Sequence, residues 1–240
     1  MTNTKIEENT IAEIVADNYK TADVFKQHGI DFCCGGKKTV ETVCEQKGID
    51  FTTLSEELSA VFNEKKPTED FNSWELDFLI DYIANTHHKY IESNVPLIQE
   101  YADKVARVHG HHYIEVVEIA HLFREISAEL IPHMKKEELI LFPNIKRMVV
   151  SIRNNEPVLP APFGSIQNPI NMMEAEHDGA GDIIKKIAEL SNNFQPPAEA
   201  CNTYRVLYAK LQEFQDDLFQ HIHLENNILF PKAIELEKQG

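Results

Sequence analysis

Two short stretches of this sequence carry the same residue types at the same offsets. The first, HMKKEELILFP, begins at His133, and the second, HIHLENNILFP, begins at His221. Each has a glutamate four residues after the histidine, Glu137 and Glu225, and then Leu-Phe-Pro. Residues four apart lie one turn apart on one face of a helix, so each pair can bind the same metal ion. Imidazole and carboxylate together suit iron, manganese or zinc.

Two further histidines precede these stretches at nearly equal distances. His88 lies 45 residues before His133, and His177 lies 44 residues before His221. The spacing predicts two helical hairpins, each supplying one single histidine and one His-x-x-x-Glu unit. Antiparallel pairing of the hairpins brings four imidazoles and two carboxylates to one level. Two ionised carboxylates in an apolar core repel each other, and two cations bridged by both glutamates remove that repulsion. We expect each Leu-Phe pair to form the floor of this cavity.

The elements that must position these residues are four long helical patterns. Ser73 and Asn168 are the expected N-cap residues of the first and third, and Pro169 follows at the first helical position. Long helices joined by short or Pro-rich connections predict an all-α protein with a four-helix bundle over residues 73–240. The expected spans are about 73–108, 112–150, 168–193 and, after FQPPAE, a last helix to about 238.

The N-terminal part of the chain reads as a separate module. Residues 1–62 show helical spacing of apolar side chains, interrupted by GIDFCCGGKK, and residues 63–72 read as a polar linker. We expect a turn here with left-handed glycines, and Cys33 and Cys34 at a helix start. There the backbone N–H groups, Lys37 and Lys38 would favour the thiolate, which predicts a reactive dithiol that handles iron, nitric oxide or a partner's thiol.

Composition excludes several function classes. The net charge of −16 argues against non-specific binding to nucleic acid or to an anionic membrane, since both need basic surface. The chain has no apolar run of membrane-spanning length, and its first residues lack the pattern of a signal peptide. We therefore expect a cytoplasmic protein. Four cysteines in a reducing compartment do not indicate a disulfide framework.

The sequence leaves some assignments open. His87 adjoins His88 on a face that is also partly apolar, and periodicity alone does not separate them, although the hairpin repeat slightly favours His88. Glu129 lies one turn before His133 and is expected to face inward, and Glu176 precedes His177. Both are either acids that bond to the ligands or carry protons, or residues of the rim.

These motifs resemble the Repair of Iron Centres family. The resemblance rests on DFCCGGK (31–37), HMKKEELILFP, MEAEHDGAG (173–181) and HIHLENNILFP, and it covers nearly the whole chain. It implies a haemerythrin-like four-helix bundle after a small domain that carries vicinal cysteines. It also implies two iron ions, bridged by both glutamates and an oxo or hydroxo group. The ligands by resemblance are His88, His133, Glu137, His177, His221 and Glu225, with acids at Glu129 and Glu176 near an access path.

The resemblance further implies a function. Members of the family are implicated in the recovery of iron–sulfur clusters after nitric oxide or oxidative damage, so iron–sulfur proteins are the expected clients. Nitric oxide or oxygen is the expected small ligand, and a homodimer is left open. Two alternatives remain at this point: a sensor or carrier of oxygen or nitric oxide, and an enzyme such as a nitric oxide reductase.

Overall fold

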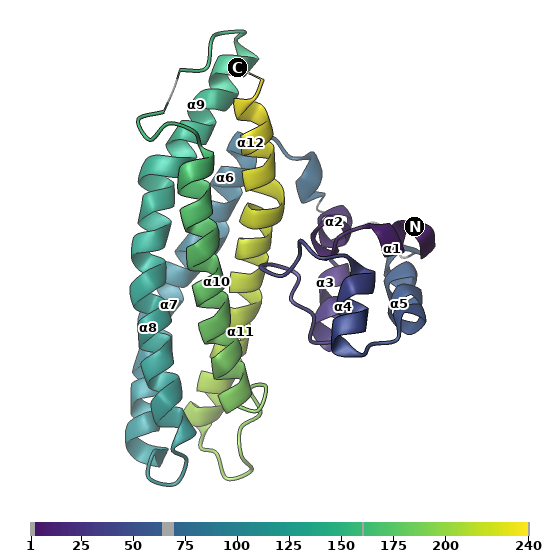
Figure 1. Ribbon diagram of the computed structural model, residues 1–240. Helices are drawn as coiled ribbons and strands as arrows, with labels where there is room; N and C mark the ends of the chain where they lie inside the picture. The colour runs from purple at the N-terminus through teal and green to yellow at the C-terminus, as the bar shows by residue number, and fades with distance from the viewer. Residues whose placement is uncertain (1–2, 64–69, 160, 240) are drawn as a thin grey trace.

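The computed structural model describes residues 3–63, 70–159 and 161–239. Figure 1 shows a long upright bundle of helices with a smaller helical domain beside it. The described residues contain no β-strand, only two isolated bridges. The expectation of an all-α protein is therefore confirmed. Of the predicted linker 63–72, residues 64–69 lie outside the described part of the chain.

The small domain is built from short helices whose buried apolar side chains belong to a cluster that continues into the bundle. A capping box opens the second helix, because the Thr10 side chain accepts from the Glu13 N–H while the Glu13 carboxylate accepts from the Thr10 N–H. Phe25 and Leu54 are fully buried in this domain. Its helices are α1 (Asn3–Glu8), α2 (Ile11–Asp17), α3 (Thr21–Gln27), α4 (Val40–Lys47) and α5 (Phe51–Asn63).

The bundle consists of four long helical segments, which we call rods. In three of them one turn of π-helix lies between two α-helices. A 3₁₀ turn, η1 (Phe71–Ser73), precedes the first rod. The rods are α6 (Leu76–Ile83), η2 (Ala84–His88) and α7 (Lys89–His109); α8 (Glu115–Lys136), η3 (Glu137–Leu141) and α9 (Phe142–Arg153); α10 (Gln167–Leu190); and α11 (Asn202–Leu224), η4 (Glu225–Leu229) and α12 (Phe230–Glu237).

The predictions of Ser73 and Asn168 as N-cap residues are both wrong. Ser73 lies in the 3₁₀ turn, where its hydroxyl donates to the Asp70 carbonyl, and α6 begins three residues later at Leu76. Asn168 lies inside α10, whose N-cap position is Ile166 and carries no side-chain cap. Ser73 and Asn168 therefore bond to carbonyls of the preceding turns and do not cap their helices.

The three π-helical turns all coincide with candidate ligands. His88 is the last residue of η2, while Glu137 and Glu225 are the first residues of η3 and η4. After each of the last two turns the N–H of the phenylalanine bonds five residues back, to the carbonyl of the glutamate. A proline follows each phenylalanine, and since it has no N–H it loses no donor where the register changes. Single π turns of this kind occur frequently at functional sites.

The buried apolar side chains form two clusters along the bundle. One runs through the small domain and the lower part of the rods, ending near Ile91, Leu130 and Ile222; the other fills the upper part, beginning near Ile83 and Leu224. A layer of buried polar side chains separates them.

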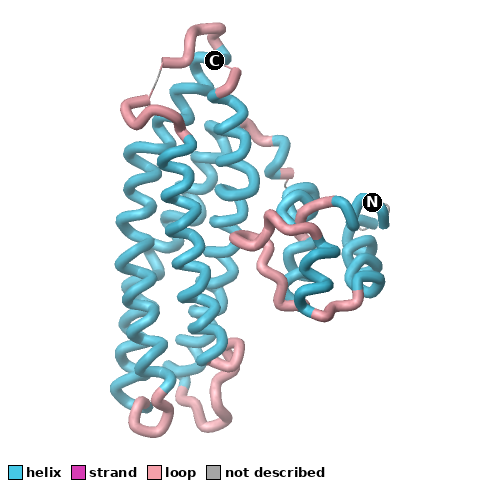
Figure 2. The backbone as a smooth tube through the Cα atoms, in the orientation of Figure 1, coloured by secondary structure: helices cyan, strands magenta, loops and turns pink. Residues whose placement is uncertain are grey.

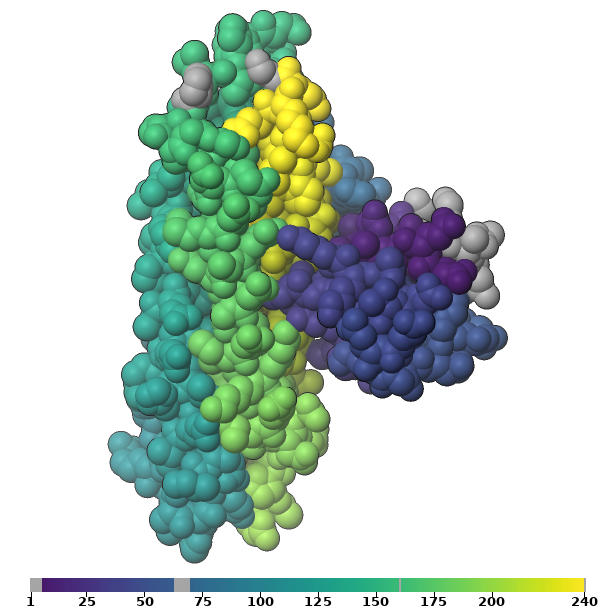
Figure 3. Space-filling view, in the orientation of Figure 1, coloured from purple at the N-terminus to yellow at the C-terminus, as the bar shows by residue number. Residues whose placement is uncertain are grey.

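The small domain packs against the bundle at mid-height, over α10 and α11 (Figure 3). Phe32 of the small domain meets Phe219 edge-on at 6.2 Å between ring centroids, and Lys185 bonds to Asp31 at 2.5 Å. Within the described residues, no helix combines the length and the apolar character that crossing a membrane requires.

Candidate metal centre

The structure brings all six sequence-predicted metal residues together in the polar layer. Each is at most 1% exposed. Their ligand atoms form two groups, in each of which the atoms lie within 4.8 Å of one another. The two groups share both glutamates, so the arrangement is two cation positions with a common pair of carboxylates. The first group is His88, Glu137, His221 and Glu225, and the second is His133, Glu137, His177 and Glu225.

The distances fit ions placed between paired imidazoles. His88 Nε2 lies 3.2 Å from His221 Nε2, and His133 Nε2 lies 2.9 Å from His177 Nε2. Two nitrogens at right angles, each ~2.1 Å from one ion, lie about 3.0 Å apart. The carboxylate oxygens lie 3.1–3.8 Å from these nitrogens. Little movement is therefore needed to place an ion at each position.

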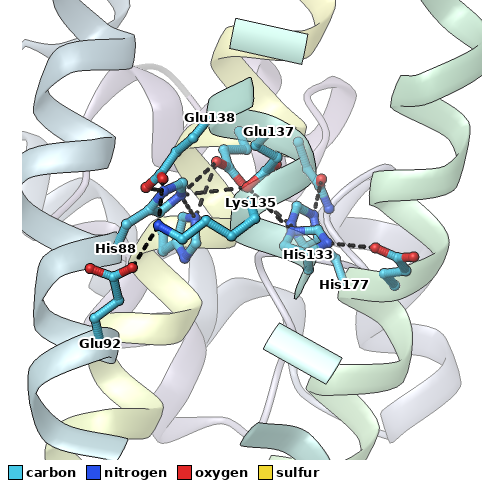
Figure 4. A network of polar contacts seen from close by, with 11 residues as sticks. His88, Glu92, His133, Lys135, Glu137, Glu138 and His177 are labelled. Carbon is cyan, nitrogen blue, oxygen red and sulfur yellow. Dashed lines mark hydrogen bonds and ion pairs between the residues drawn. The ribbon is translucent and has the colours of Figure 1, made fainter. Parts of the chain in front are cut away.

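Three of the four histidines are oriented by a partner on the outer ring nitrogen. Glu138 bonds to His88 Nδ1 at 3.0 Å, as Figure 4 shows, and Glu176 bonds to His133 Nδ1 at 2.7 Å. The amide oxygen of Asn226 lies 2.7 Å from His177 Nδ1. Each partner accepts from an Nδ1–H, which leaves the Nε2 lone pair directed at the metal position.

His221 differs from the other three. Its Nδ1 has no hydrogen-bond partner among the described residues. Its ring lies parallel to that of His87, with centroids 5.7 Å apart and an interplanar angle of 3°. His87 itself bonds through Nδ1 to Asp217 at 2.9 Å. The structure therefore separates the two adjacent histidines: His88 faces the centre, and His87 packs behind a candidate ligand.

Lysines support the two acidic partners at the surface of the bundle. Lys135 bonds to Glu138 at 2.8 Å and to Glu92 at 2.7 Å (Figure 4), and Lys136 bonds to Glu176. Burial raises the pKa of Glu138 and Glu176, but the lysine and histidine beside each carboxyl outweigh burial and lower the pKa. Both groups therefore stay ionised and keep accepting from the imidazoles.

The glutamates of the centre carry the clearest sign that a cation belongs here. All four carboxylate oxygens of Glu137 and Glu225 are buried without a hydrogen-bond partner in the described chain. Leaving such a group unpaired is expensive, and a metal ion satisfies it. In the metal-free chain, protonated imidazoles partly balance the charge of the two carboxylates. Burial lowers the pKa of His88 and His177, but the glutamates outweigh it and raise the pKa to about 10 and about 9.

Aromatic side chains close the centre on the side of α9 and α12, the helices that follow two of the π turns. Phe142 stacks on His88 with centroids 5.6 Å apart, and Phe230 stacks on His177 at 6.1 Å. The prediction that the two Leu-Phe pairs floor the cavity is confirmed for the phenylalanines. These rings exclude water from one side of the polar layer.

Comparison with known proteins agrees with this geometry. The family model described as "Hemerythrin HHE cation binding domain" matches residues 79–233, which include all of the second and third rods and most of the first and fourth. The chain belongs to this cation-binding family. A second model, described as "Domain of Unknown function (DUF542)", matches residues 7–62.

Curated relatives of this family cover nearly the whole chain. The protein named iron-sulfur cluster repair protein YtfE from Yersinia pseudotuberculosis serotype IB (strain PB1/+) is 39% identical over 214 residues, which is 89% of this chain and 91% of that protein. The protein of the same name from Yersinia pestis (strain Pestoides F) is 38% identical over 218 residues, 91% of this chain and 93% of that protein. The chain therefore also belongs to the family of iron–sulfur cluster repair proteins.

The two additional acids have different places in the structure. Glu176 contacts a candidate ligand, as described above, whereas Glu129 is exposed on α8. The prediction that Glu129 faces inward is wrong. Four residues of α-helix turn through about 400°, which is one full turn and about 40° more. Glu129, four residues before His133, is therefore rotated away from it by about 40° to one side. Glu137 and Leu130 are rotated to the other side of His133, and that side faces the core.

Sequence reasoning missed two residues that contact the centre, Glu138 and Asn226. Each follows the glutamate of its repeated stretch directly, and each holds the single histidine of its own hairpin. The repeat therefore contained the signal: a polar residue occupies the same offset in both copies. The role of this polar residue depends on the histidine of the neighbouring rod, and the sequence pattern of a single helix does not show that contact.

The vicinal cysteines lie in a bend and not at a helix start. The bend joins α3 to α4, and α4 begins only at Val40. The two glycines that follow Cys34 do not have the left-handed backbone that the sequence predicts. Gly36 is required for a different reason, because a Cβ there would lie 2.6 Å from the carbonyl oxygen of Phe32.

The environment of Cys33 also corrects the sequence-based expectation. Lys37 bonds to Glu174 at 2.8 Å and the next lysine bonds to a glutamine, so neither ammonium group is bonded to the thiols. The hydrogen bond to the neighbouring cysteine, burial and a nearby carboxylate raise the pKa of Cys33 well above its usual value. Cys33 is therefore a protonated thiol at neutral pH, and the predicted thiolate is wrong for this residue.

Proposed function

We propose that this chain holds two iron ions in the bundle and acts in the repair of iron–sulfur clusters damaged by nitric oxide or oxidative stress. The main support is the pair of four-residue groups that share Glu137 and Glu225. The relatives that match about nine-tenths of the chain are named iron-sulfur cluster repair proteins. Iron–sulfur proteins are accordingly the proposed clients, and the cytoplasmic location remains a prediction from the sequence.

The donor set supports a pair of iron ions over one closed structural ion. Four imidazole nitrogens and two carboxylates give each position two histidines and a share of both glutamates, which leaves coordination positions open. Nitrogen and oxygen ligands of this kind suit iron, and they also suit manganese, so a metal analysis is part of the test. Bound iron supplies one-electron redox chemistry and open positions for nitric oxide or oxygen.

The residues of the chain contribute orientation and proton handling. Glu138 and Glu176 bond to buried imidazoles while their own side chains are 26% and 35% exposed. They therefore connect the Nδ1 atoms of His88 and His133 to the surface of the bundle. A metal that enters the centre would displace the protons on Nε2, while these carboxylates keep the Nδ1–H in place and hold each imidazole in the metal-binding tautomer.

The test is the recovery of a damaged iron–sulfur enzyme. An iron–sulfur enzyme inactivated with nitric oxide is incubated with the iron-loaded, reduced chain, and its activity is followed over time. We expect recovery that exceeds the recovery given by the metal-free chain or by an equal amount of free ferrous iron. The Glu137→Gln variant should give none, and Glu129→Gln, an exposed position on the same rod, should match the unaltered chain.

The same experiment separates the two routes to repair. If iron moves from the chain, labelled iron in the bundle appears in the recovered cluster. If the chain removes nitric oxide, activity returns while the label stays in the bundle. Steady consumption of nitric oxide without any recovery would instead indicate a nitric oxide reductase, and reversible ligand binding alone would indicate a sensor or carrier. Either of the last two results would contradict the repair function.

A further inference from the structure

A loop of the small domain carries a second cluster of metal-binding side chains. This loop, residues 28–39, joins α3 to α4 and is a part of the small domain that reaches the bundle (Figures 1 and 2). Asp31, Cys33 and Cys34 each offer one ligand atom there, and the three atoms lie within 4.8 Å of one another. We propose that these three residues bind one thiophilic divalent metal ion, at a site separate from the centre in the bundle.

The spacing of the sulfur atoms matches a tetrahedral ion. Cys33 Sγ lies 3.8 Å from Cys34 Sγ. Two thiolates each ~2.3 Å from a tetrahedral ion lie about 3.8 Å apart. The carboxylate oxygen Oδ1 of Asp31 lies 3.2 Å from Cys33 Sγ, compared with about 3.6 Å for a sulfur and an oxygen around such an ion. The cluster therefore needs only a small adjustment to close around a metal.

The surroundings of Asp31 hold its carboxylate toward the sulfurs. Lys185 of α10 binds the other oxygen, Oδ2, at 2.5 Å. Oδ1 accepts from the backbone N–H groups of Cys33 and Cys34, at 3.0 Å each. Burial raises the pKa of Asp31, but Lys185 and the other donors outweigh it and lower the pKa, so the group is ionised at neutral pH. One oxygen thus remains beside both thiols with its charge intact.

Contacts with the bundle hold the loop in this shape. The amide Nδ2 of Asn227 donates to the carbonyls of Phe32 and Cys33, at 3.2 and 3.3 Å. Cys34 Sγ lies 3.6 Å from the carbonyl oxygen of His177. A Cβ at Gly181 would lie 3.3 Å from Cys34 Sγ, so the glycine makes room for the sulfur on α10. The cluster is therefore assembled partly by the third and fourth rods, which both carry candidate ligands of the other centre.

Binding is an exchange of protons for the ion, without electron transfer. Each thiol releases its proton to solvent as its sulfur bonds to the metal, and the carboxylate bonds without releasing one. Two sulfur ligands and one carboxylate favour a thiophilic divalent ion such as zinc. Three protein ligands leave the fourth position open, which is typical of an exchangeable ion.

The ion has access from solvent. Cys33 is 2% exposed, but Cys34 is only half-buried, so an ion can approach from its side. The site does not depend on the proposed repair function: the thiol cluster binds or fails to bind whatever the bundle does. Its position against α10 would nevertheless place an exchangeable ion next to the bundle.

Cobalt(II) is the probe for this site, because sulfur ligation gives it an intense charge-transfer absorption that nitrogen and oxygen ligation does not. The full chain is first loaded with iron in the bundle and then titrated with cobalt(II). We expect one equivalent of cobalt with the sulfur charge-transfer band, displaced stoichiometrically by zinc. Absence of the band would overturn the proposal, since the bundle centre contains no sulfur ligand.

Substitutions locate the ion. Cys34→Ser should weaken cobalt binding by more than about 10-fold and roughly halve the sulfur band, and Asp31→Asn should weaken binding about 10-fold while the band keeps its intensity. Cys201→Ser removes an exposed thiol outside the cluster and is the matched control, with no expected change. Equal loss in the Cys201 variant would mean that the thiols bind cobalt without a defined site.

A second measurement uses the unaltered chain, so its result does not depend on whether a variant folds. Iodoacetamide alkylates accessible thiols, and the peptide that contains Cys33 and Cys34 is followed by mass spectrometry. We expect zinc to slow alkylation of Cys34 by about 10-fold or more, while Cys201 reacts at the same rate with and without zinc. Equal rates at Cys34 would contradict the site even if cobalt binds elsewhere.

Discussion

The two halves of the candidate metal centre contain the same types of side chain, but different neighbours support their imidazoles. In the half formed by His133 and His177, both Nδ1 atoms have a partner, Glu176 and Asn226. In the half formed by His88 and His221, only His88 has one. Because a bonded Nδ1 fixes the tautomer and the ring orientation, the first half is better prepared to hold a metal.

The difference comes from one position of the internal repeat. The residue after each shared glutamate supports the single histidine of its hairpin, and this holds in both hairpins. The residue before each single histidine is the exception: Glu176 bonds to His133, whereas the equivalent His87 only stacks on His221. Burial lowers the pKa of His221 to about 3, because the nearby imidazoles of His88 and His87 add to it and Glu225 offsets it only in part. A symmetric set of ligands can therefore hold two ions unequally.

Loss of a shared glutamate should affect both halves, and it is the largest effect that we expect. Glu225→Gln removes a charge that four imidazoles face, so both ions should be lost or bound at least about 100-fold more weakly. Metal per folded chain, measured by elemental analysis after gel filtration, tests this. Glu213→Gln, an exposed position earlier in the same rod, is the control. Retention of one tightly bound ion would show that the glutamate serves only one half.

Loss of Glu176 should weaken only the better-supported half. Glu176→Gln keeps the size of the side chain but removes the charge that holds His133, so affinity for one of the two ions should fall about 10–100-fold. A competition titration with a coloured chelator resolves the two ions. Glu129→Gln on the exposed face of α8 should leave both affinities unchanged. Equal weakening of both ions would indicate that the halves are not independent.

Metal affinity should rise with pH, through protons on one histidine of each half. His88 and His177, with pKa values raised to about 10 and about 9, are protonated at neutral pH in the metal-free chain. Metal must displace those protons, so apparent affinity should increase about tenfold per pH unit for each proton released and level off above about pH 10. Calorimetry in buffers of different ionisation enthalpy counts the protons, and we expect roughly two per chain near pH 7. Affinity independent of pH would contradict the assignment.

The smallest effect should be a difference in the rate of metal removal. A chelator should take the ion beside His221 about three- to tenfold faster than the ion beside His133, which gives two kinetic phases. His87→Gln offers the missing acceptor to His221 Nδ1 and should slow the fast phase until the two merge. A single phase in the unaltered chain, or no change in this variant, would show that ring packing alone orients His221 well enough.

Most of the candidate metal residues could be read from the sequence because a helix has a fixed period. Residues four apart share a face in any α-helix, and the 44- and 45-residue distances allow only a few hairpin geometries. The four rods follow from the same periodicity, to within a few residues at most ends. The N-caps were less predictable, since Ser73 found a hydrogen bond in the preceding turn that competes with capping.

The π turns were not predictable in the same way. A helix changes from i→i−4 to i→i−5 hydrogen bonds only where packing between rods compensates the poorer local geometry. The inserted residue then rotates every side chain that follows it. Pro143 and Pro231 predicted a kink or the end of a helical segment, but they did not predict a π turn. The exposed position of Glu129 has a related cause, because a rotation of about 40° about the helix axis decides which flank of the helix meets the next rod.

The sequence by itself determined an all-helical chain, the two hairpins and the His-x-x-x-Glu units that lie in one buried layer, because these depend on helical period and on the chemistry of each side chain. Only the tertiary structure decided which atoms support each imidazole, which of two adjacent histidines enters the centre, and where the cysteine loop rests. Those outcomes depend on side chains from different rods and domains within a few ångströms of one another. Such contacts follow from packing geometry, which no local pattern in one helix contains.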